Sequence, residues 1–115
     1  MSRTTRETAW IKAALKEFGK FPLPAQRMMA RALTVAAEGG KADIAKPMKG
    51  LGSGVFEIAL PYHTDAYRVV YAVQIDEAIW VVHAFQKKST IGIKTSQEEI
   101  DLIRERIKRL KEELR

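Results

Sequence analysis

Apolar residues in the first forty positions recur at helical spacing, in one set between residues 7 and 18 and another between residues 25 and 38. The sets are Ala9, Trp10, Ala13, Ala14 and Phe18, and then Met28, Met29, Ala32, Leu33, Val35 and Ala36. This pattern predicts two helices. Gly19 and Pro22 stop the first helix, and Gly39-Gly40 ends the second, as glycine commonly does just past a helix.

The middle of the chain changes to an alternation of period two, which is typical of strands. A loop with Pro47, Gly50, Gly52 and Gly54 precedes the alternation. Strands are predicted over residues 55–60, 66–75 and 78–86, with Pro61 breaking the first. Because both connections are short, the strands should form a three-stranded antiparallel meander. In the second strand, Tyr67, Val69, Tyr71 and Val73 share one face, and Arg68, Val70 and Ala72 lie on the other.

A third helix is predicted near the end of the chain, where Ser96 and Glu99 have the spacing of a capping box. Its apolar stripe consists of Ile100, Ile103, Ile107, Leu110 and Leu114. With 115 residues the chain is long enough for one core. We therefore expect a single α+β domain over residues 1–115, with helices packed on one face of a small antiparallel sheet.

Composition and charge narrow the class of protein. The chain has 46% hydrophobic and 30% charged residues, which is ordinary for a soluble globular protein. It has no cysteine, which fits the cytoplasm, and no apolar run near the ~20 residues of a membrane span. The net charge of +6 sits on the flanks, because residues 51–85 hold one arginine against four acids. Solubility alone can explain this charge, and so can an anionic partner such as nucleic acid or an acidic protein.

Charged residues interrupt the predicted strands and are the candidate site. They are Glu57, Arg68, His83, Lys87 and Lys88. Burying an unpaired charge is costly, so such residues usually form pairs or line a site. A rim of arginine and lysine suits a phosphate-rich ligand. No metal or cofactor is expected, because the histidines are far apart and no glycine-rich nucleotide loop is present.

Each candidate also has a purely structural interpretation. Arg68 and Glu57 can form an ion pair across neighbouring strands, which is compatible with a site because the carboxylate would hold the guanidinium. Lys87 and Lys88 can be a solvated strand end, and alternation points only one of them to any site. The same alternation puts His83 on the face of Val81 and Phe85, where a bonded core histidine is more usual than a catalytic base.

The order of several motifs resembles one known family. The motifs are an N-terminal Trp10 before a short helix, Lys20-Phe21-Pro22, Glu38-Gly39-Gly40-Lys41, Lys46-Pro47-Met48-Lys49-Gly50-Leu51-Gly52, Gly54-Val55-Phe56-Glu57-Ile58, Tyr67-Arg68-Val69-Val70-Tyr71, His83-Ala84-Phe85-Gln86-Lys87-Lys88-Ser89 and Gly92-Ile93-Lys94-Thr95. Together they resemble the phage-derived, HigB-like branch of the RelE/ParE toxin superfamily. Two positions differ from the frequent family pattern: Ala59 stands where an arginine often follows, and Thr95-Ser96 where Thr-Pro is common.

The resemblance implies a RelE-like fold and a type II toxin that cleaves messenger RNA on the ribosome. Cleavage would proceed without metal, by attack of the ribose 2′-hydroxyl, with Arg68, Lys87, Lys88, Glu57 and His83 as candidates. The implied partners are the ribosome, mRNA and an antitoxin from the adjacent gene, of the helix-turn-helix type. A gyrase poison of the ParE kind and an inactive prophage remnant are the alternatives. The resemblance also implies a strand over residues 6–11, against the helical periodicity there.

Overall fold

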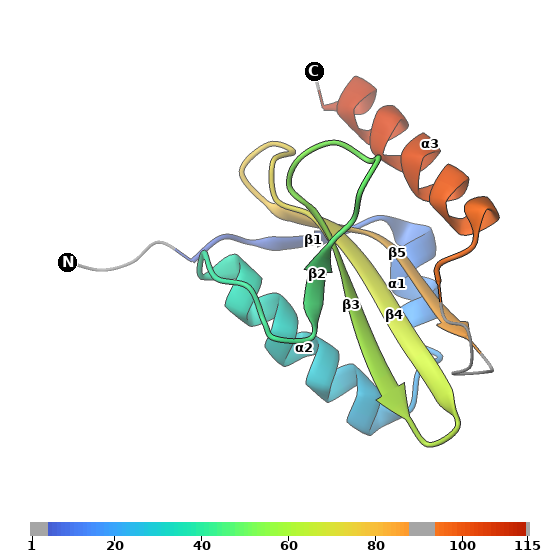
Figure 1. Cartoon of the computed structure of the whole chain (residues 1–115). Helices are drawn as coiled ribbons and strands as arrows, with labels where there is room; N and C mark the ends of the chain where they lie inside the picture. Colours follow the sequence, from blue (N-terminus) through green and yellow to red (C-terminus); the bar gives the residue numbers. More distant parts are fainter. Residues whose placement is uncertain (1–4, 88–93, 115) are drawn as a thin grey trace.

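The computed structural model describes residues 5–87 and 94–114. Within these residues, five strands form one mixed sheet, in which the spatial order is β1-β5-β4-β3-β2. Figure 1 labels the strands and colours the chain from its N-terminus to its C-terminus. The strands are β1 (Thr8–Trp10), β2 (Ala45–Pro47), β3 (Val55–Tyr62), β4 (Asp65–Ala72) and β5 (Ile79–Lys87). The helices are α1 (Lys12–Phe18), α2 (Leu23–Ala37) and α3 (Gln97–Glu113). The predicted α+β class and antiparallel meander are confirmed.

The N-terminal segment is a strand followed by a short helix, as the resemblance implied and the helical periodicity did not. β1 pairs in parallel with β5, with Ala9 opposite Trp80. Arg6 anchors its start, because the guanidinium donates to the carbonyl oxygens of Val73, Glu77 and Ala78. These three hydrogen bonds to the β4–β5 connection hold in place a segment whose own sequence favours a helix. The sheet is therefore mixed rather than purely antiparallel.

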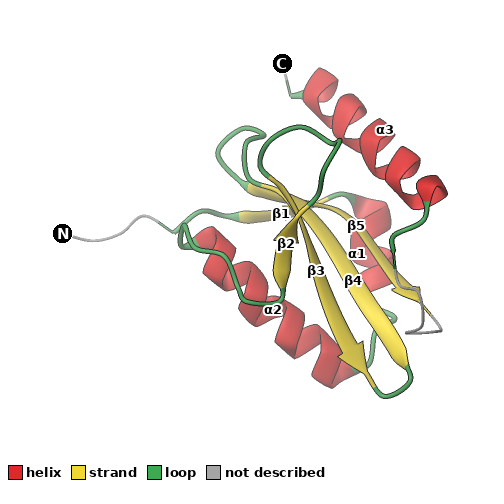
Figure 2. Cartoon of the chain, viewed as in Figure 1, coloured by secondary structure: helices red, strands yellow, loops and turns green. Residues whose placement is uncertain are grey.

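The helices cover both faces of the sheet, and the expectation that they lie on one face is wrong. α1 and α2 pack against Ile58, Tyr67, Val69 and Tyr71. On the opposite face α3 packs against another cluster, which contains Leu51, Val55, Val70, Ala72 and Val82. Figure 2 shows α1 and α2 together behind the strands and α3 apart from them. Both faces of β4 carry apolar residues, so both need a covering layer.

The sheet differs from the prediction in three details. β4 ends at Ala72, although the second strand was predicted to reach residue 75. β3 continues through Pro61 to Tyr62, since β2 pairs with β3 only up to Ile58 and leaves this part of β3 at an edge of the sheet. Proline is tolerated on such edges because no neighbouring strand needs its missing N–H. The third difference is β2 itself, which lies in the predicted loop and pairs Lys46 with Glu57.

Candidate active site

A groove of about 750 Å³ opens on the α3 side of the sheet, between β2, β3, β4 and the segment before α3. Its described lining includes four basic side chains and two acidic ones. The basic residues are Lys46, Lys49, Arg68 and Lys94, and the acidic residues are Asp43 and Glu57. The excess of positive charge makes the groove suited to an anion.

Arg68 and Glu57 form a buried ion pair at the wall of this groove. The strand register places Arg68 opposite Ala59 and Glu57 opposite Val70, so the two charged side chains lie diagonally on one face. Arg68 Nη1 donates to Glu57 Oε1 at 2.6 Å, and the Arg68 side chain is only 6% exposed. Thr95 joins the pair, because its hydroxyl accepts from Arg68 Nη1 at 3.1 Å and donates to Glu57 Oε2. The guanidinium is therefore held in one orientation.

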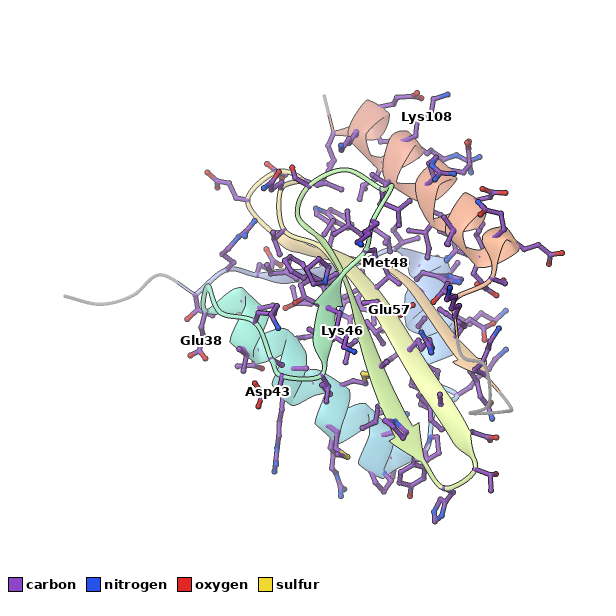
Figure 3. The ribbon with its side chains drawn as sticks, viewed as in Figure 1. Glu38, Asp43, Lys46, Met48, Glu57 and Lys108 are labelled. Carbon is purple, nitrogen blue, oxygen red and sulfur yellow. The ribbon has the colours of Figure 1, made fainter. Side chains whose placement is uncertain are left out.

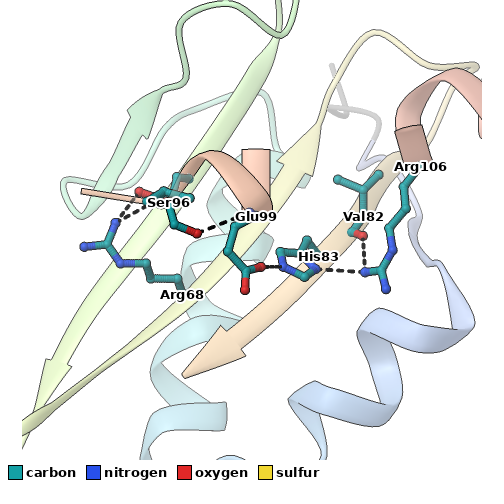
Figure 4. A network of polar contacts seen from close by, with 8 residues as sticks. Arg68, Val82, His83, Ser96, Glu99 and Arg106 are labelled. Atoms are coloured by element: carbon teal, nitrogen blue, oxygen red, sulfur yellow. Dashed lines mark hydrogen bonds and ion pairs between the residues drawn. The ribbon is translucent and has the colours of Figure 1, made fainter. Parts of the chain in front are cut away.

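His83 belongs to a second network on the same face, shown with the first in Figure 4. Its Nδ1 accepts from Arg106 Nη1 at 2.8 Å, and its Nε2 bonds to Glu99. Arg106 also donates to the carbonyl oxygen of Val82 at 3.1 Å. Burial lowers the pKa of His83, against the opposing effect of Glu99, and burial likewise lowers the pKa of Arg106. His83 is thus a bonded residue between the sheet and α3, with both ring nitrogens in use.

A β-bulge explains why His83 does not share a face with Val81. Val70 pairs with His83 but Tyr71 pairs with Val81, so the register shifts by one residue between them. His83 therefore shares a face with Phe85, as predicted, but not with Val81. A bulge adds one residue to a strand and reverses the alternation beyond it.

Of the two lysines predicted at the end of β5, the structure describes Lys87. Lys87 pairs with Ala66, two residues from the Arg68–Phe85 pair, so Lys87 and Arg68 lie on the same face. Lys87 is half-buried, and it is not among the described residues that line the groove. Lys88 lies outside the described residues.

Five polar lining residues were not predicted from the sequence as site residues: Asp43, Lys46, Lys49, Lys94 and Thr95. Lys46 was hidden because β2 has only three residues, too few to show alternation. Thr95 precedes the N-cap Ser96 of α3, whose hydroxyl accepts from the Glu99 N–H at 3.3 Å. Of the two bonds of the predicted capping box, the one to the Ser96 hydroxyl is confirmed. The Glu99 carboxylate bonds to His83 instead.

The arrangement can bind and neutralise a phosphate but offers no evident general base. Both oxygens of Glu57 and both nitrogens of His83 accept or donate hydrogen bonds within the protein. No cluster of metal-binding side chains occurs within residues 5–87 and 94–114. The chemistry that these groups can supply is charge stabilisation by guanidinium and ammonium groups.

The fold defines a class of proteins with solved members. A mutant of E. coli toxin RelE in the free state matches with a TM-score of 0.61 and 21% sequence identity, covering 91% of this chain and 97% of that one. The crystal structure of the isolated E. coli RelE toxin, in its P21 form, matches with a TM-score of 0.57 and 19% sequence identity, covering 87% of this chain and 97% of that one. The fold is therefore the RelE fold, as the resemblance implied.

The family follows from the sequence itself. Residues 16–108 match the model of the phage-derived Gp49-like proteins, and the chain belongs to this family. The expected phage-derived relationship is confirmed, and the assignment to the HigB-like branch stays a prediction. No curated protein matches the sequence significantly. Among the described helices, none is both long and apolar enough to cross a membrane.

Proposed function

We propose that this protein is the toxin of a type II toxin–antitoxin pair and that it cleaves messenger RNA on the ribosome. The observation that carries the proposal is the buried Arg68, held by Glu57 and Thr95 at the wall of a groove rich in lysine. Membership of a phage-derived family and the RelE fold support it. Such a toxin would act in the cytoplasm, where its targets are.

The proposed reaction is strand scission by the ribose 2′-hydroxyl. A water molecule takes the proton of the 2′-hydroxyl, and the 2′-oxygen attacks the adjacent phosphorus. The bond to the 5′-oxygen breaks as that oxygen gains a proton. The products are a 2′,3′-cyclic phosphate and a 5′-hydroxyl. Arg68 stabilises the charge that develops on the phosphate oxygens. Lys87 or Lys88 donates the proton to the leaving oxygen, and Glu57 chiefly orients Arg68.

The ribosome is proposed to align the substrate. The described site has no unengaged base beside Arg68, so it is poorly equipped to place a flexible 2′-hydroxyl for in-line attack. Alignment can contribute several kcal/mol to lowering a barrier, on the order of 7 kcal/mol in well-oriented systems. A message held in the decoding site would bring that alignment with it.

The antitoxin is proposed to be a helix-turn-helix protein encoded by the adjacent gene. The chain carries a net charge of +6, and an acidic partner would associate faster at low salt. Co-expression with that gene should rescue growth, and the two proteins should co-purify. Co-expression without binding or rescue would contradict the toxin assignment.

The decisive experiment compares mRNA in ribosome complexes with naked RNA, followed by mapping of 5′ ends. The wild-type protein should cleave the first and leave the second largely intact. Lys87→Ala should reduce cleavage at least tenfold, as loss of a general acid does. Lys108→Ala, which removes an exposed lysine of α3, is the charge-matched control. Altered plasmid supercoiling without RNA cleavage would favour the gyrase-poison alternative instead.

A further inference from the structure

Lys46 lines the groove from the short edge strand β2. Its backbone pairs with Glu57, and Ala45 and Pro47 pair with Ile58 and Phe56 on either side. Figure 3 shows Lys46 and Glu57 next to each other on these two strands. Because directly opposite residues share a face, Lys46 lies on the face that carries Glu57 and Arg68. Its side chain is exposed, whereas Arg68 is buried.

Glu57 is the nearest carboxylate by register, yet its oxygens are bonded to other groups. Oε1 accepts from Arg68 and Oε2 accepts from Thr95. Within the described parts of the chain, no ion pair joins Lys46 to a carboxylate. The ammonium of Lys46 therefore forms no ion pair with Glu57, the residue opposite it in the sheet.

The lysines give the groove its net positive charge and therefore its attraction for anions. Arg68 and Glu57 neutralise each other as a pair. The remaining lining charges are Lys46, Lys49 and Lys94 against Asp43, which leaves the groove positive. Lys49 lies in the turn after β2, and Lys94 lies in the segment before α3. Lys46 is the lysine whose backbone is fixed in the sheet.

The space between Lys46 and Arg68 is open because a small residue lies there. Ala59 pairs with Arg68, is two residues from Glu57 on the same face, and lines the groove. Its N–H donates to the Ile44 carbonyl oxygen at 3.1 Å, which ties β3 to the start of β2. A methyl group leaves room for a ligand atom where a longer side chain would fill the groove.

We propose that Lys46 binds a backbone phosphate of single-stranded RNA, next to the phosphate that Arg68 stabilises. This inference rests on the proposed function for the identity of the ligand. Under this proposal, Arg68 stabilises the reacting phosphate, and Lys46 fixes the position of the RNA. An edge lysine can instead serve only to prevent strand pairing between molecules, and the test separates the two roles.

The binding test uses a single-stranded RNA oligonucleotide with 2′-O-methyl riboses, which the proposed reaction cannot cleave. Its affinity is measured by fluorescence anisotropy over a range of salt concentrations. Lys46→Ala should weaken binding about fivefold at low salt and reduce the salt slope by about 0.7, the loss of one phosphate contact on a single strand. Lys46→Arg should bind like wild type, and Lys108→Ala should leave the slope unchanged.

A second-site variant tests the location of the contact. In Lys46→Ala/Met48→Lys the ammonium returns to the same groove from a lining position two residues along the chain, and at least half of the lost salt slope should return. Equal binding by Lys46→Ala and Lys108→Ala would overturn the inference. So would a Lys46→Ala protein that differs from wild type only by self-association in analytical ultracentrifugation.

Cleavage of mRNA in ribosome complexes is measured on the same variants. Lys46→Ala should cleave at least tenfold more slowly than Lys108→Ala, and Lys46→Arg should recover the rate. If wild-type protein cleaves no RNA, the proposed function fails, and the binding measurements still decide whether Lys46 holds a phosphate. Active wild-type protein with full activity and binding in Lys46→Ala would refute the role of Lys46 alone.

Discussion

Arg106 Nη1 donates a hydrogen bond to His83 Nδ1 across 2.8 Å, and this contact determines the state of the imidazole. Because Nδ1 accepts, the ring proton resides on Nε2, where it meets Glu99. A second proton on Nδ1 would point at the guanidinium. The bonds of His83 to Arg106 and Glu99 together connect β5 to α3 at two positions of the helix, and the charge of Arg106 opposes protonation of His83.

This relationship predicts a loss of stability in mild acid. Burial lowers the pKa of His83 from 6.5, with Arg106 acting in the same direction and Glu99 and Glu17 against it. The unfolded chain therefore binds a proton at higher pH than the folded chain, so the free energy of unfolding should fall as pH drops below about 6.5. Thermal unfolding between pH 7.5 and 5.5 measures it.

A pair of histidine variants isolates this effect from that of the carboxylates. His83→Gln should be less stable than wild type at pH 7.5 by about 1–3 kcal/mol, through lost hydrogen bonds, and should show a flatter dependence on pH. His63→Gln changes an exposed turn residue and should keep the wild-type dependence. Identical pH dependence in wild type and His83→Gln would contradict the assignment.

The Arg68–Glu57 pair should be costly to break from one side and cheaper to replace whole. Arg68→Ala leaves the Glu57 side chain, which is 15% exposed, without its charge partner. We expect a loss of about 2–4 kcal/mol in urea unfolding, below the full cost of a dry site because Glu57 keeps some water contact. Arg68→Met/Glu57→Leu should recover most of this stability and remain inactive. A double variant less stable than either single one would contradict this account.

The local parts of the fold were predictable because their signals are local. Alternation in β4 placed Tyr67 and Arg68 on opposite faces, and the structure has the same arrangement. Ser96 and Glu99 located the start of α3. The Glu57–Arg68 contact was foreseen as one of two interpretations, because opposite charges on neighbouring strands attract.

The remaining features depend on contacts between distant segments. β1 is a strand because it pairs with β5, although Ala9 and Trp10 also fit a helix. The bulge between Val70 and Tyr71 puts Val81 on the opposite face from His83, and no turn residue in β5 marks it. The position of Lys46 follows from a strand of three residues that has its partner, Glu57, in β3. Periodicity within one segment cannot show such pairings.

The turn before β3 gives a prediction about backbone conformation. Gly52 and Gly54 have φ angles of +88° and +77°, which side chains rarely adopt. An added Cβ at Gly52 would meet no atom within 4 Å, whereas at Gly54 it would lie 2.8 Å from Cγ of Gln74. Gly52→Ala should cost about 1–2 kcal/mol from the backbone alone. Gly54→Ala should cost about 1 kcal/mol more, from overpacking.

Gln74→Ala is the control for that difference. It removes the Cγ atom, so Gly54→Ala in this background should cost no more than Gly52→Ala does. The Ser53 hydroxyl donates to Gln74 Oε1 at 2.8 Å and loses this partner in Gln74→Ala. Because both Gln74→Ala and Gln74→Ala/Gly54→Ala lack this bond, its loss cancels when their stabilities are compared. Chemical denaturation of all five proteins measures the differences, and an unchanged excess cost at Gly54 would contradict the proposed clash.

Thr95 gives the last prediction, because one hydroxyl connects the start of α3 to the buried ion pair. It accepts from Arg68 Nη1 at 3.1 Å and donates to Glu57 Oε2. Thr95→Val keeps the shape and removes both bonds, so it should lower the free energy of unfolding by about 1–2 kcal/mol. Thr95→Ser keeps the hydroxyl and should stay within about 0.5 kcal/mol of wild type.

Activity should follow the same order, for a different reason. Without the Thr95 hydroxyl, Arg68 keeps Glu57 as a partner but loses one of the contacts that fix its orientation. A misplaced guanidinium stabilises the transition state less well, so Thr95→Val should cleave RNA in ribosome complexes about tenfold more slowly at a temperature where it is fully folded. Thr95→Ser should cleave at nearly the wild-type rate. Equal loss in both variants would mean that the methyl group of Thr95, and not its hydroxyl, supports the site.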